Sequence, residues 1–113
     1  MTFKLHISGA GKQDIRSQQR WYESDPLRGG SDLAERWLEG LSEEMGMLLQ
    51  HPEKFPFAPE NGRWKPHLKL RQMVYRPWKG KPGWRVLYVI LNKTQQISVV
   101  HIRHESRRWL HDS

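Results

Sequence analysis

Residues 83–104 read GWRVLYVILNKTQQISVVHIRH, and they contain two neighbouring segments of strand character. Residues 83–91 and 95–104 are rich in the β-branched and aromatic side chains that suit a pleated strand. Asn92, Lys93 and Thr94 lie between them, a length and composition typical of a short hairpin turn. The stretch therefore predicts two antiparallel strands that are neighbours in one sheet.

Two further segments of strand character lie outside this hairpin. Residues 67–76 precede it, separated by a basic connection at residues 77–82 that contains proline and glycine. Residues 3–7, FKLHI, alternate apolar and polar side chains with the period of a strand that buries one face. Residues 52–67 are rich in proline, which breaks both regular periods, and are predicted to form an ordered loop held by its aromatic side chains.

One helix is predicted with a clear start and end. Over residues 31–51 an apolar stripe recurs every three to four positions, as on a helix that faces a core. Ser31 or Asp32 can cap its start, with Glu35 completing a capping box. Pro52 ends it, because proline cannot continue a helix.

A second, more polar helix is predicted before it. Residues 10–24 carry sparse apolar side chains spaced six to seven apart, which returns them to one helix face. Residues 25–30, DPLRGG, separate the two helices, since proline restricts the preceding residue and glycine permits turn geometry. The two helices are therefore expected to form a hairpin.

The resulting order of elements, β-α-α-β-β-β, defines an α+β domain. We expect a mainly antiparallel four-stranded sheet, with the N-terminal helical hairpin packed on one face and the opposite face open to a partner. A chain of 113 residues has room for one domain, so residues 1–113 are expected to form a single unit.

Composition excludes several classes of function. Because the chain has no cysteine, thiol catalysis, zinc knuckles and iron–sulfur clusters are excluded. No run approaches the ~20 apolar residues of a membrane span, and the opening MTFKLHISGAGK lacks the apolar centre of a secretory signal. We expect a soluble cytoplasmic protein that makes no membrane contact and uses no metal or other cofactor.

Charge is divided unequally along the chain. Residues 1–62 hold seven Lys and Arg against ten Asp and Glu, whereas residues 63–113 hold twelve against two. The net charge of +7 therefore comes from the C-terminal half of the chain. Such a concentration favours nucleic acid, the ribosome or an acidic protein as partner.

Arg85 is a lone charge inside an apolar strand. Because such a charge is costly to bury, we expect its side chain to point out of the sheet toward a partner. Basic and aromatic residues are interleaved around it, a pattern that suits single-stranded RNA, with cations on phosphates and rings on unpaired bases. Trp84 is better explained as a core residue. The candidates for RNA contact are Arg71, Arg76, Lys79, Lys81, Arg107 and Arg108.

His101, Arg103 and His104 lie at the end of the last predicted strand. A metal site on the two histidines fails on geometry, because residues three apart on a strand point to opposite sides. Histidine can instead act as acid or base while arginines hold a phosphate, so that the RNA 2′-hydroxyl attacks without a metal. A basic strand end that only binds explains the same residues equally well.

The helix that ends in MGMLLQHPEKFPF and the strands LKLRQMVYRP, GWRVLYVILN and ISVVHIRHESRRW resemble the RelE/ParE superfamily of type II toxin–antitoxin toxins. The resemblance extends over residues 3–109. Its most specific parts are WRVLY at residues 84–88, where the family commonly has an aromatic, Arg, two apolar residues and Tyr, and VHIRH at residues 100–104, followed by Arg107 and Arg108.

The resemblance implies a single toxin domain neutralised by a cognate antitoxin. RelE-like members cut mRNA on the ribosome without a metal, and such a ribosome-dependent mRNA endonuclease is our leading hypothesis. Arg85 and Arg103 would then hold the scissile phosphate, and His104 would act as acid and base. The RNA backbone would lie on the basic residues named above as candidates for RNA contact.

ParE-like members of the superfamily inhibit DNA gyrase instead, by binding and without catalysis, and this is the alternative. The tyrosine that several nucleases carry near the C-terminus is absent, with Trp109 the nearest aromatic residue. The long helical hairpin of residues 10–50 and the terminal His-x-x-Arg-Arg also occur among ParE-like members. A third interpretation is a non-toxic relative that only binds its antitoxin or DNA.

Overall fold

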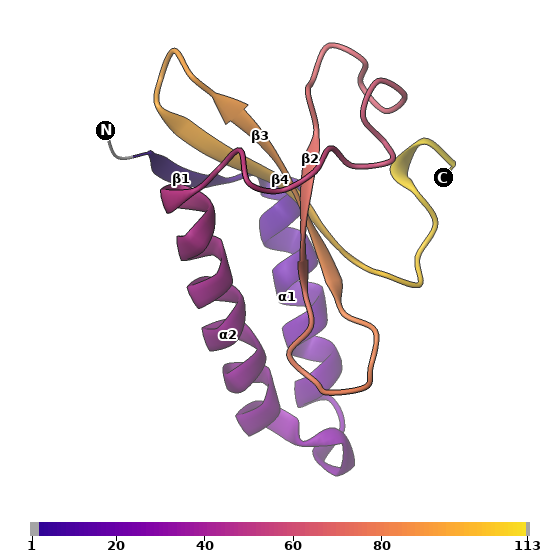
Figure 1. The fold of residues 1–113 in the computed structure, drawn as a ribbon. Helices are drawn as coiled ribbons and strands as arrows, with labels where there is room; N and C mark the ends of the chain where they lie inside the picture. Colours follow the sequence, from indigo (N-terminus) through magenta and orange to yellow (C-terminus); the bar gives the residue numbers. More distant parts are fainter. Residues whose placement is uncertain (1–2, 113) are drawn as a thin grey trace.

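A computed structural model of the chain describes residues 3–112. Its elements follow the predicted order, with small shifts at their ends, the largest at the second strand (Figure 1). They are β1 (Lys4–Ile7), α1 (Gly9–Glu23), η1 (Pro26–Arg28), α2 (Gly30–Gln50), β2 (Arg71–Tyr75), β3 (Trp84–Leu91), β4 (Gln96–His104) and η2 (Leu110–Asp112), where η marks a short 3₁₀ turn. The predicted β-α-α-β-β-β order is confirmed.

The four strands form one mixed sheet in the order β1-β4-β3-β2. β2, β3 and β4 are antiparallel neighbours, whereas β1 runs parallel to β4, with Lys4 opposite Gln96 and Ile7 opposite Val99. The sheet is therefore mainly antiparallel, with one parallel pair that the sequence does not predict. Alternation along residues 3–7 indicates which face of the strand is buried, but not its direction relative to a strand far along the chain.

The start of α1 is attached to β4. Ser8 caps the helix by accepting a hydrogen bond from the Gly11 N–H at 3.0 Å, and its hydroxyl donates to Val100 O at 2.9 Å. Val100 is the extra residue where the β3–β4 register shifts. One turn further along, the Asp14 carboxylate accepts from the Ile102 N–H at 2.9 Å. These contacts determine how the helical hairpin lies on the sheet.

The start of α2 differs from the sequence prediction. The helix begins at Gly30 behind Gly29, whose φ of +112° is a left-handed conformation that glycine tolerates. No side chain caps this end. The predicted Ser31 or Asp32 cap with Glu35 is therefore wrong, because the glycine turn already brings these residues inside the helix.

The main core lies between the helical hairpin and one face of the sheet. Trp37 and Leu41 of α2 are fully buried there, as are Val86 and Tyr88 of β3. Each such side chain contributes about 1.5–3 kcal/mol on burial. Trp84, at 5% exposure, belongs to the same cluster, which confirms its interpretation as a core residue.

The other face of the sheet is covered as well. Residues 52–70 cross it and bring Leu70 against Leu87 and Val89 of β3, and Leu110 of η2 joins this second cluster. The prediction of an open face is wrong, because apolar side chains of the loop bury themselves against the apolar strand residues that the helices leave uncovered.

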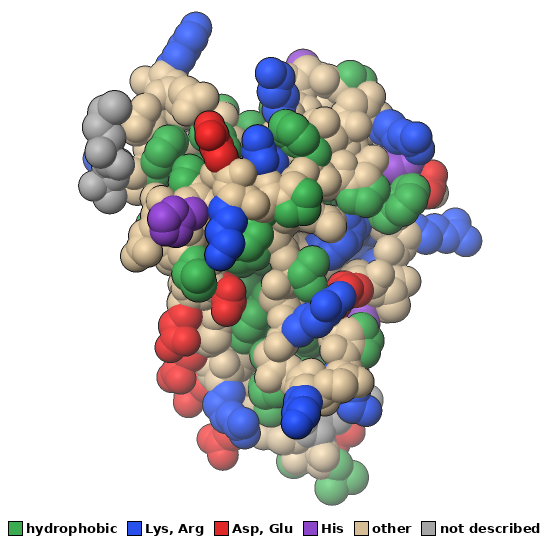
Figure 2. Space-filling view, in the orientation of Figure 1, with side chains coloured by type: hydrophobic (Ala, Val, Ile, Leu, Met, Phe, Trp, Pro, Cys, Tyr) green, Lys and Arg blue, Asp and Glu red, His purple; other side chains and the backbone are tan. Residues whose placement is uncertain are grey.

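The outer surface of the helices is polar. α2 carries five acidic residues against one arginine, and Figure 2 shows acidic side chains gathered along this helix. Basic side chains are spread over other parts of the face displayed there. Within residues 3–112, neither helix is both long and apolar enough to cross a membrane.

The contact between α2 and β2 can be tested at a glycine. A Cβ added to Gly40 would collide with the hydroxyl of Tyr75, which donates to Trp37 O at 2.7 Å, whereas a Cβ added to Gly46 meets nothing. We expect Gly40→Ala to lower the free energy of unfolding by about 1–3 kcal/mol through overpacking. Gly46→Ala should raise it by up to ~1 kcal/mol through helix propensity. Urea denaturation measures both, and equal effects would contradict the packing.

Candidate functional site

Arg85 is buried in an ion pair on the face that residues 52–70 cover. Its Nη1 and Nη2 donate to the two carboxylate oxygens of Glu60, each at 2.8 Å, and the two side chains are 7% and 0% exposed. Gln72 accepts a further hydrogen bond at 3.1 Å. The expectation of an outward-facing, accessible Arg85 is wrong, because a carboxylate from a distant loop compensates the charge.

Glu60 is held as an anion in this site. Burial acts to raise the pKa of its carboxyl, but hydrogen bonds from Arg85 and the Leu110 N–H, together with the Arg85 charge, outweigh burial and hold that pKa below its usual 4.5. The Leu110 N–H lies 3.2 Å from Oε2. One carboxylate therefore joins the loop, β3 and the C-terminal turn.

Arg103 lies opposite Arg85 on β4 and is 9% exposed. Its Nη2 donates to Arg108 O at 2.8 Å, and no acceptor among the described residues lies within hydrogen-bond distance of Nε. Burial first, and then the charges of Arg107 and Arg85, lower the pKa of its guanidinium. With one carboxylate for two arginines, this face retains a net positive charge.

His104 lies on the other face of the sheet, away from Arg85 and Arg103. Its ring meets Trp84 edge-on, with 5.2 Å between centroids and an interplanar angle of 88°. The Ser106 N–H donates to its Nδ1 at 3.2 Å, so that Nε2 carries the proton in the neutral ring. The three predicted catalytic residues are therefore not brought together: two face the loop, and the third faces the helical hairpin.

The two histidines at the end of β4 have separate partners. His101 Nδ1 lies 2.8 Å from Asp14 of α1, and its ring contacts Trp64, whereas His104 Nδ1 lies 2.7 Å from the Ser106 hydroxyl. Within residues 3–112, no three His, Asp or Glu side chains gather in a way that could hold a metal ion.

The residues predicted to bind RNA differ in their surroundings. Arg71 donates to Phe55 O at 2.6 Å and stacks on Phe57. Arg76 makes two hydrogen bonds of 2.8 Å to Glu105. Both therefore have protein partners, although Arg76 is still 62% exposed. The remaining four are exposed as well: Lys79, Lys81, Arg107 and Arg108. RNA contact by any of the six stays a prediction.

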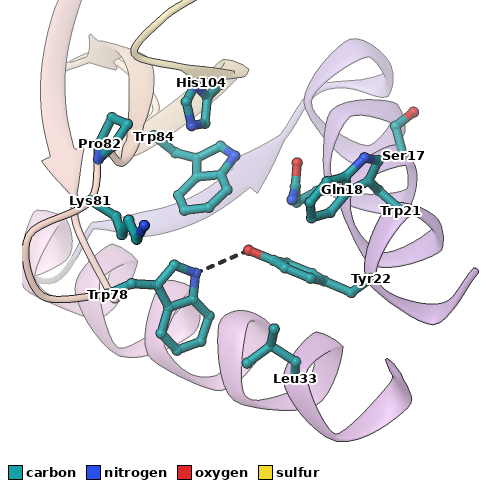
Figure 3. Close-up of a pocket in the computed structure, with 10 residues that line it drawn as sticks. All are labelled: Ser17, Gln18, Trp21, Tyr22, Leu33, Trp78, Lys81, Pro82, Trp84 and His104. Atoms are coloured by element: carbon teal, nitrogen blue, oxygen red, sulfur yellow. Dashed lines mark hydrogen bonds between the residues drawn. The ribbon is translucent and has the colours of Figure 1, made fainter. Parts of the chain in front are cut away.

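A pocket of about 690 Å³ opens between the helical hairpin and the connection from β2 to β3 (Figure 3). The Trp78 indole N–H of that connection donates to the Tyr22 hydroxyl of α1 at 3.0 Å and ties the two walls together. Trp84 and His104 form the wall on the sheet side. The lining residues are Ser17, Gln18, Trp21, Tyr22, Leu33, Trp78, Lys81, Pro82, Trp84 and His104.

Sequence patterns alone do not predict this pocket. Trp21 and Tyr22 are foreseen as helix residues and Trp84 as core, but nothing local indicates that Trp78 meets Tyr22, 56 positions away. The one sequence feature that indicates the pocket is the mixture of aromatic and basic residues between Trp78 and Trp84, and the same feature also fits an RNA-binding surface.

The fold is shared with solved toxins of toxin–antitoxin systems. The chain is similar to a structure of the chromosomal ParDE system of P. aeruginosa, with a TM-score of 0.63 and 13% identity over 90% of this chain and 95% of that chain. A mutant of the E. coli toxin RelE in the free state matches with a TM-score of 0.56 and 14% identity, over 94% and 86%. The E. coli RelBE complex matches with a TM-score of 0.52 and 13% identity, over 93% and 99%.

Family membership comes from the sequence match. Residues 6–109 match the family described as the ParE toxin of the type II toxin–antitoxin system, parDE. The chain therefore belongs to the ParE toxin family, and the resemblance to the RelE/ParE superfamily is confirmed. None of the curated proteins compared with the chain matches it.

The ion pair between Arg85 and Glu60 can be tested by removing one charge or both. We expect Glu60→Gln to lower the free energy of unfolding by about 3–5 kcal/mol, because it leaves a buried guanidinium unpaired. Replacing both partners, as Glu60→Leu with Arg85→Met, should cost less than Glu60→Gln alone, since no unpaired charge remains. Urea denaturation compares the variants. A double variant no more stable than Glu60→Gln would contradict this account.

Acid should weaken the fold through Glu105 as well as Glu60. Hydrogen bonds from Arg76 and the Gly83 N–H lower the pKa of Glu105 to about 2. A carboxyl with a lower pKa in the folded state binds fewer protons there, so its stabilisation is lost as pH falls from about 5 toward 2. We expect Glu105→Gln to flatten this pH dependence, measured by urea denaturation at several pH values. Glu39→Gln, at an exposed position of α2, is the control.

Proposed function

We propose that this toxin acts by binding DNA gyrase, as ParE-like members of the superfamily do, and not by cleaving RNA. The observation that carries the proposal is the buried pair of Arg85 and Glu60. A nuclease would need that arginine on the scissile phosphate, but its guanidinium is already occupied by a carboxylate on both Nη atoms.

The geometry around the pair adds to this argument. Freeing Arg85 for a phosphate would leave Glu60 buried and unpaired, at a cost of about 3–5 kcal/mol. His104 is separated by the sheet from Arg85 and Arg103, so it cannot share a phosphate with them in this arrangement. Inhibition by binding requires a surface complementary to the target and does not require these three side chains to converge on a phosphate.

The tip of the helical hairpin supplies a contact surface for such a target. Leu27 in η1 is 96% exposed, yet its backbone is held, because Asp25 accepts from the Leu27 N–H at 2.9 Å and the Gly29 N–H donates to Pro26 O at 3.1 Å. The hairpin extends well beyond the sheet at this end (Figure 1). Because the backbone is already held, an apolar side chain at this position binds a partner with less ordering cost than one on a flexible loop.

A cognate antitoxin is the second proposed partner. The similar P. aeruginosa and E. coli structures come from toxin–antitoxin systems, and the net charge of +7 favours an acidic partner. We expect the antitoxin to be acidic where it crosses the C-terminal strands and apolar on the helices. The proposal puts the toxin in the cytoplasm, where gyrase acts.

The proposed activity is tested by adding the purified protein to a gyrase supercoiling assay and, separately, to a translating extract. We expect supercoiling to be inhibited while ribosome-bound mRNA stays intact, because the residues of a nuclease site are not brought together. Cleaved mRNA with normal supercoiling would replace this proposal with a RelE-like nuclease. If the protein neither inhibits supercoiling nor cleaves mRNA, the result favours a non-toxic relative.

The hairpin tip can be tested with one substitution. We expect Leu27→Ser to weaken gyrase inhibition about fivefold to tenfold, the effect of losing one apolar anchor. The free energy of unfolding should change by less than about 0.5 kcal/mol, because the side chain is exposed. Leu91→Ser, at a partly exposed leucine at the end of β3 and far from the tip, is the matched control. Equal inhibition by all three proteins would remove the tip from the interface.

A further inference from the structure

The pocket beside α1 is walled by aromatic rings from segments far apart in the sequence. Tyr22 and Trp78 stand at 90° to each other, and Trp84 and His104 at 88°. Trp21, from the same face of α1, is half exposed at its edge. Such a box offers ring faces and ring edges together, which suits a large apolar side chain better than a polar one.

The polar groups at the pocket indicate the charge of its ligand. Among the described residues that line the pocket, Lys81 is the only lysine or arginine, and there is no aspartate or glutamate. His104 uses Nδ1 for Ser106, which leaves its Nε2–H as the remaining donor of the ring. A cation and a donor beside an apolar floor favour an apolar group that carries an anionic or acceptor group next to it.

We propose that this pocket is the docking site for a segment of a protein partner that inserts a large apolar side chain and places a flanking carboxylate on Lys81. A carboxylate fits because one lysine at the rim can pair with one acidic side chain. A nucleic-acid strand would bring a phosphate with every base and needs a row of cations, which the pocket lining does not supply.

The inference rests on the proposed function in one respect, that the toxin acts through protein partners. It concerns a different surface from the exposed Leu27. Direct peptide binding tests the docking site without gyrase. If the peptide binds and supercoiling is not inhibited, only the proposed function fails. If supercoiling is inhibited and the peptide does not bind, only the docking site fails.

The test uses three unlabelled tetrapeptides with blocked ends and the full-length ¹⁵N-labelled protein. The first has a Leu-Trp centre with one Glu on each side, the second replaces both Glu by Lys, and the third keeps both Glu around Ala-Ala. Calorimetry gives each Kd. The indole N–H signals report the place of binding, since Trp21, Trp78 and Trp84 line the pocket whereas Trp64 and Trp109 do not.

We expect the Glu-flanked Leu-Trp peptide to bind about tenfold more tightly than its Lys-flanked twin, because Lys81 attracts a flanking carboxylate and repels a flanking ammonium by similar modest amounts. The Ala-Ala peptide should not bind measurably. Signals of Trp21, Trp78 and Trp84 should shift, and those of Trp64 and Trp109 should not. A shift of Trp64 or Trp109, or unshifted signals of the three pocket indoles, would overturn the assignment of the site, whereas Trp37 packs against Trp84 and can shift with it.

Two variants separate the pocket from general attraction to a basic protein. Lys81→Met should weaken the acidic peptide about threefold, as expected for one exposed charge pair, and strengthen the Lys-flanked twin by a similar factor, because the repulsion is removed. Lys79→Met, in the same connection but outside the pocket lining, should change neither. Gln18→Trp, at a half-buried position of α1 that lines the pocket, should narrow it and weaken binding of both Leu-Trp peptides. Thermal unfolding verifies that each variant is folded.

Several results would overturn the proposal. Equal affinities for the acidic and basic Leu-Trp peptides would show that Lys81 does not pair with a carboxylate of the ligand. If Lys79→Met and Lys81→Met weaken binding of the acidic peptide equally, the peptide does not bind in the pocket. Binding of a single-stranded oligonucleotide that shifts the same three indole signals more strongly than the acidic peptide would assign the pocket to nucleic acid. Tighter binding of free indole-3-acetate than of the peptide would assign it to a small aromatic acid.

Discussion

The buried carboxylate of Glu60 is the constraint on which the C-terminal half of the structure depends. It neutralises Arg85 in the middle of β3 and accepts the Leu110 N–H, so three segments that are distant in sequence meet at one side chain. Without it, the strand arginine would have to leave the sheet or attract another anion. The covering loop and the C-terminal turn each contribute a partner to this site, and the second apolar cluster packs beside it.

The elements of the fold could be predicted because their signals are local. The apolar stripe that ends at Pro52 and the alternation of residues 83–91 each follow from a period that a short window reveals. The direction of β1 and the covering of the second face could not, because they depend on pairings between distant residues. Glu60 is the clearest case, since nothing near Arg85 in the sequence indicates its partner.

The candidate site was harder to predict than the fold for a related reason. Residue types at the end of β4 fit phosphate chemistry, but chemistry also requires that the side chains converge. Adjacent strand residues point to opposite faces, so Arg103 and His104 are separated by their own spacing. Residues 52–70 cover Arg85 and separate it from the solvent, and the sequence does not indicate that this loop lies over β3. What the sequence does indicate, the mixture of basic and aromatic residues around Trp78, marks the edge of a real pocket.

The parallel pairing of β1 with β4 has a consequence for how the chain acquires its structure during synthesis. Lys4 pairs opposite Gln96, and the Ser8 hydroxyl donates to Val100 O, so the first strand finds its partner only after about the first 100 residues have left the ribosome. Until then the helical hairpin can pack only on the β2–β3 pair, without β4 and β1. Such long-range closure is slow compared with local hairpin formation. A protein of this architecture therefore becomes complete only after residues 96–99 of β4 have been synthesised.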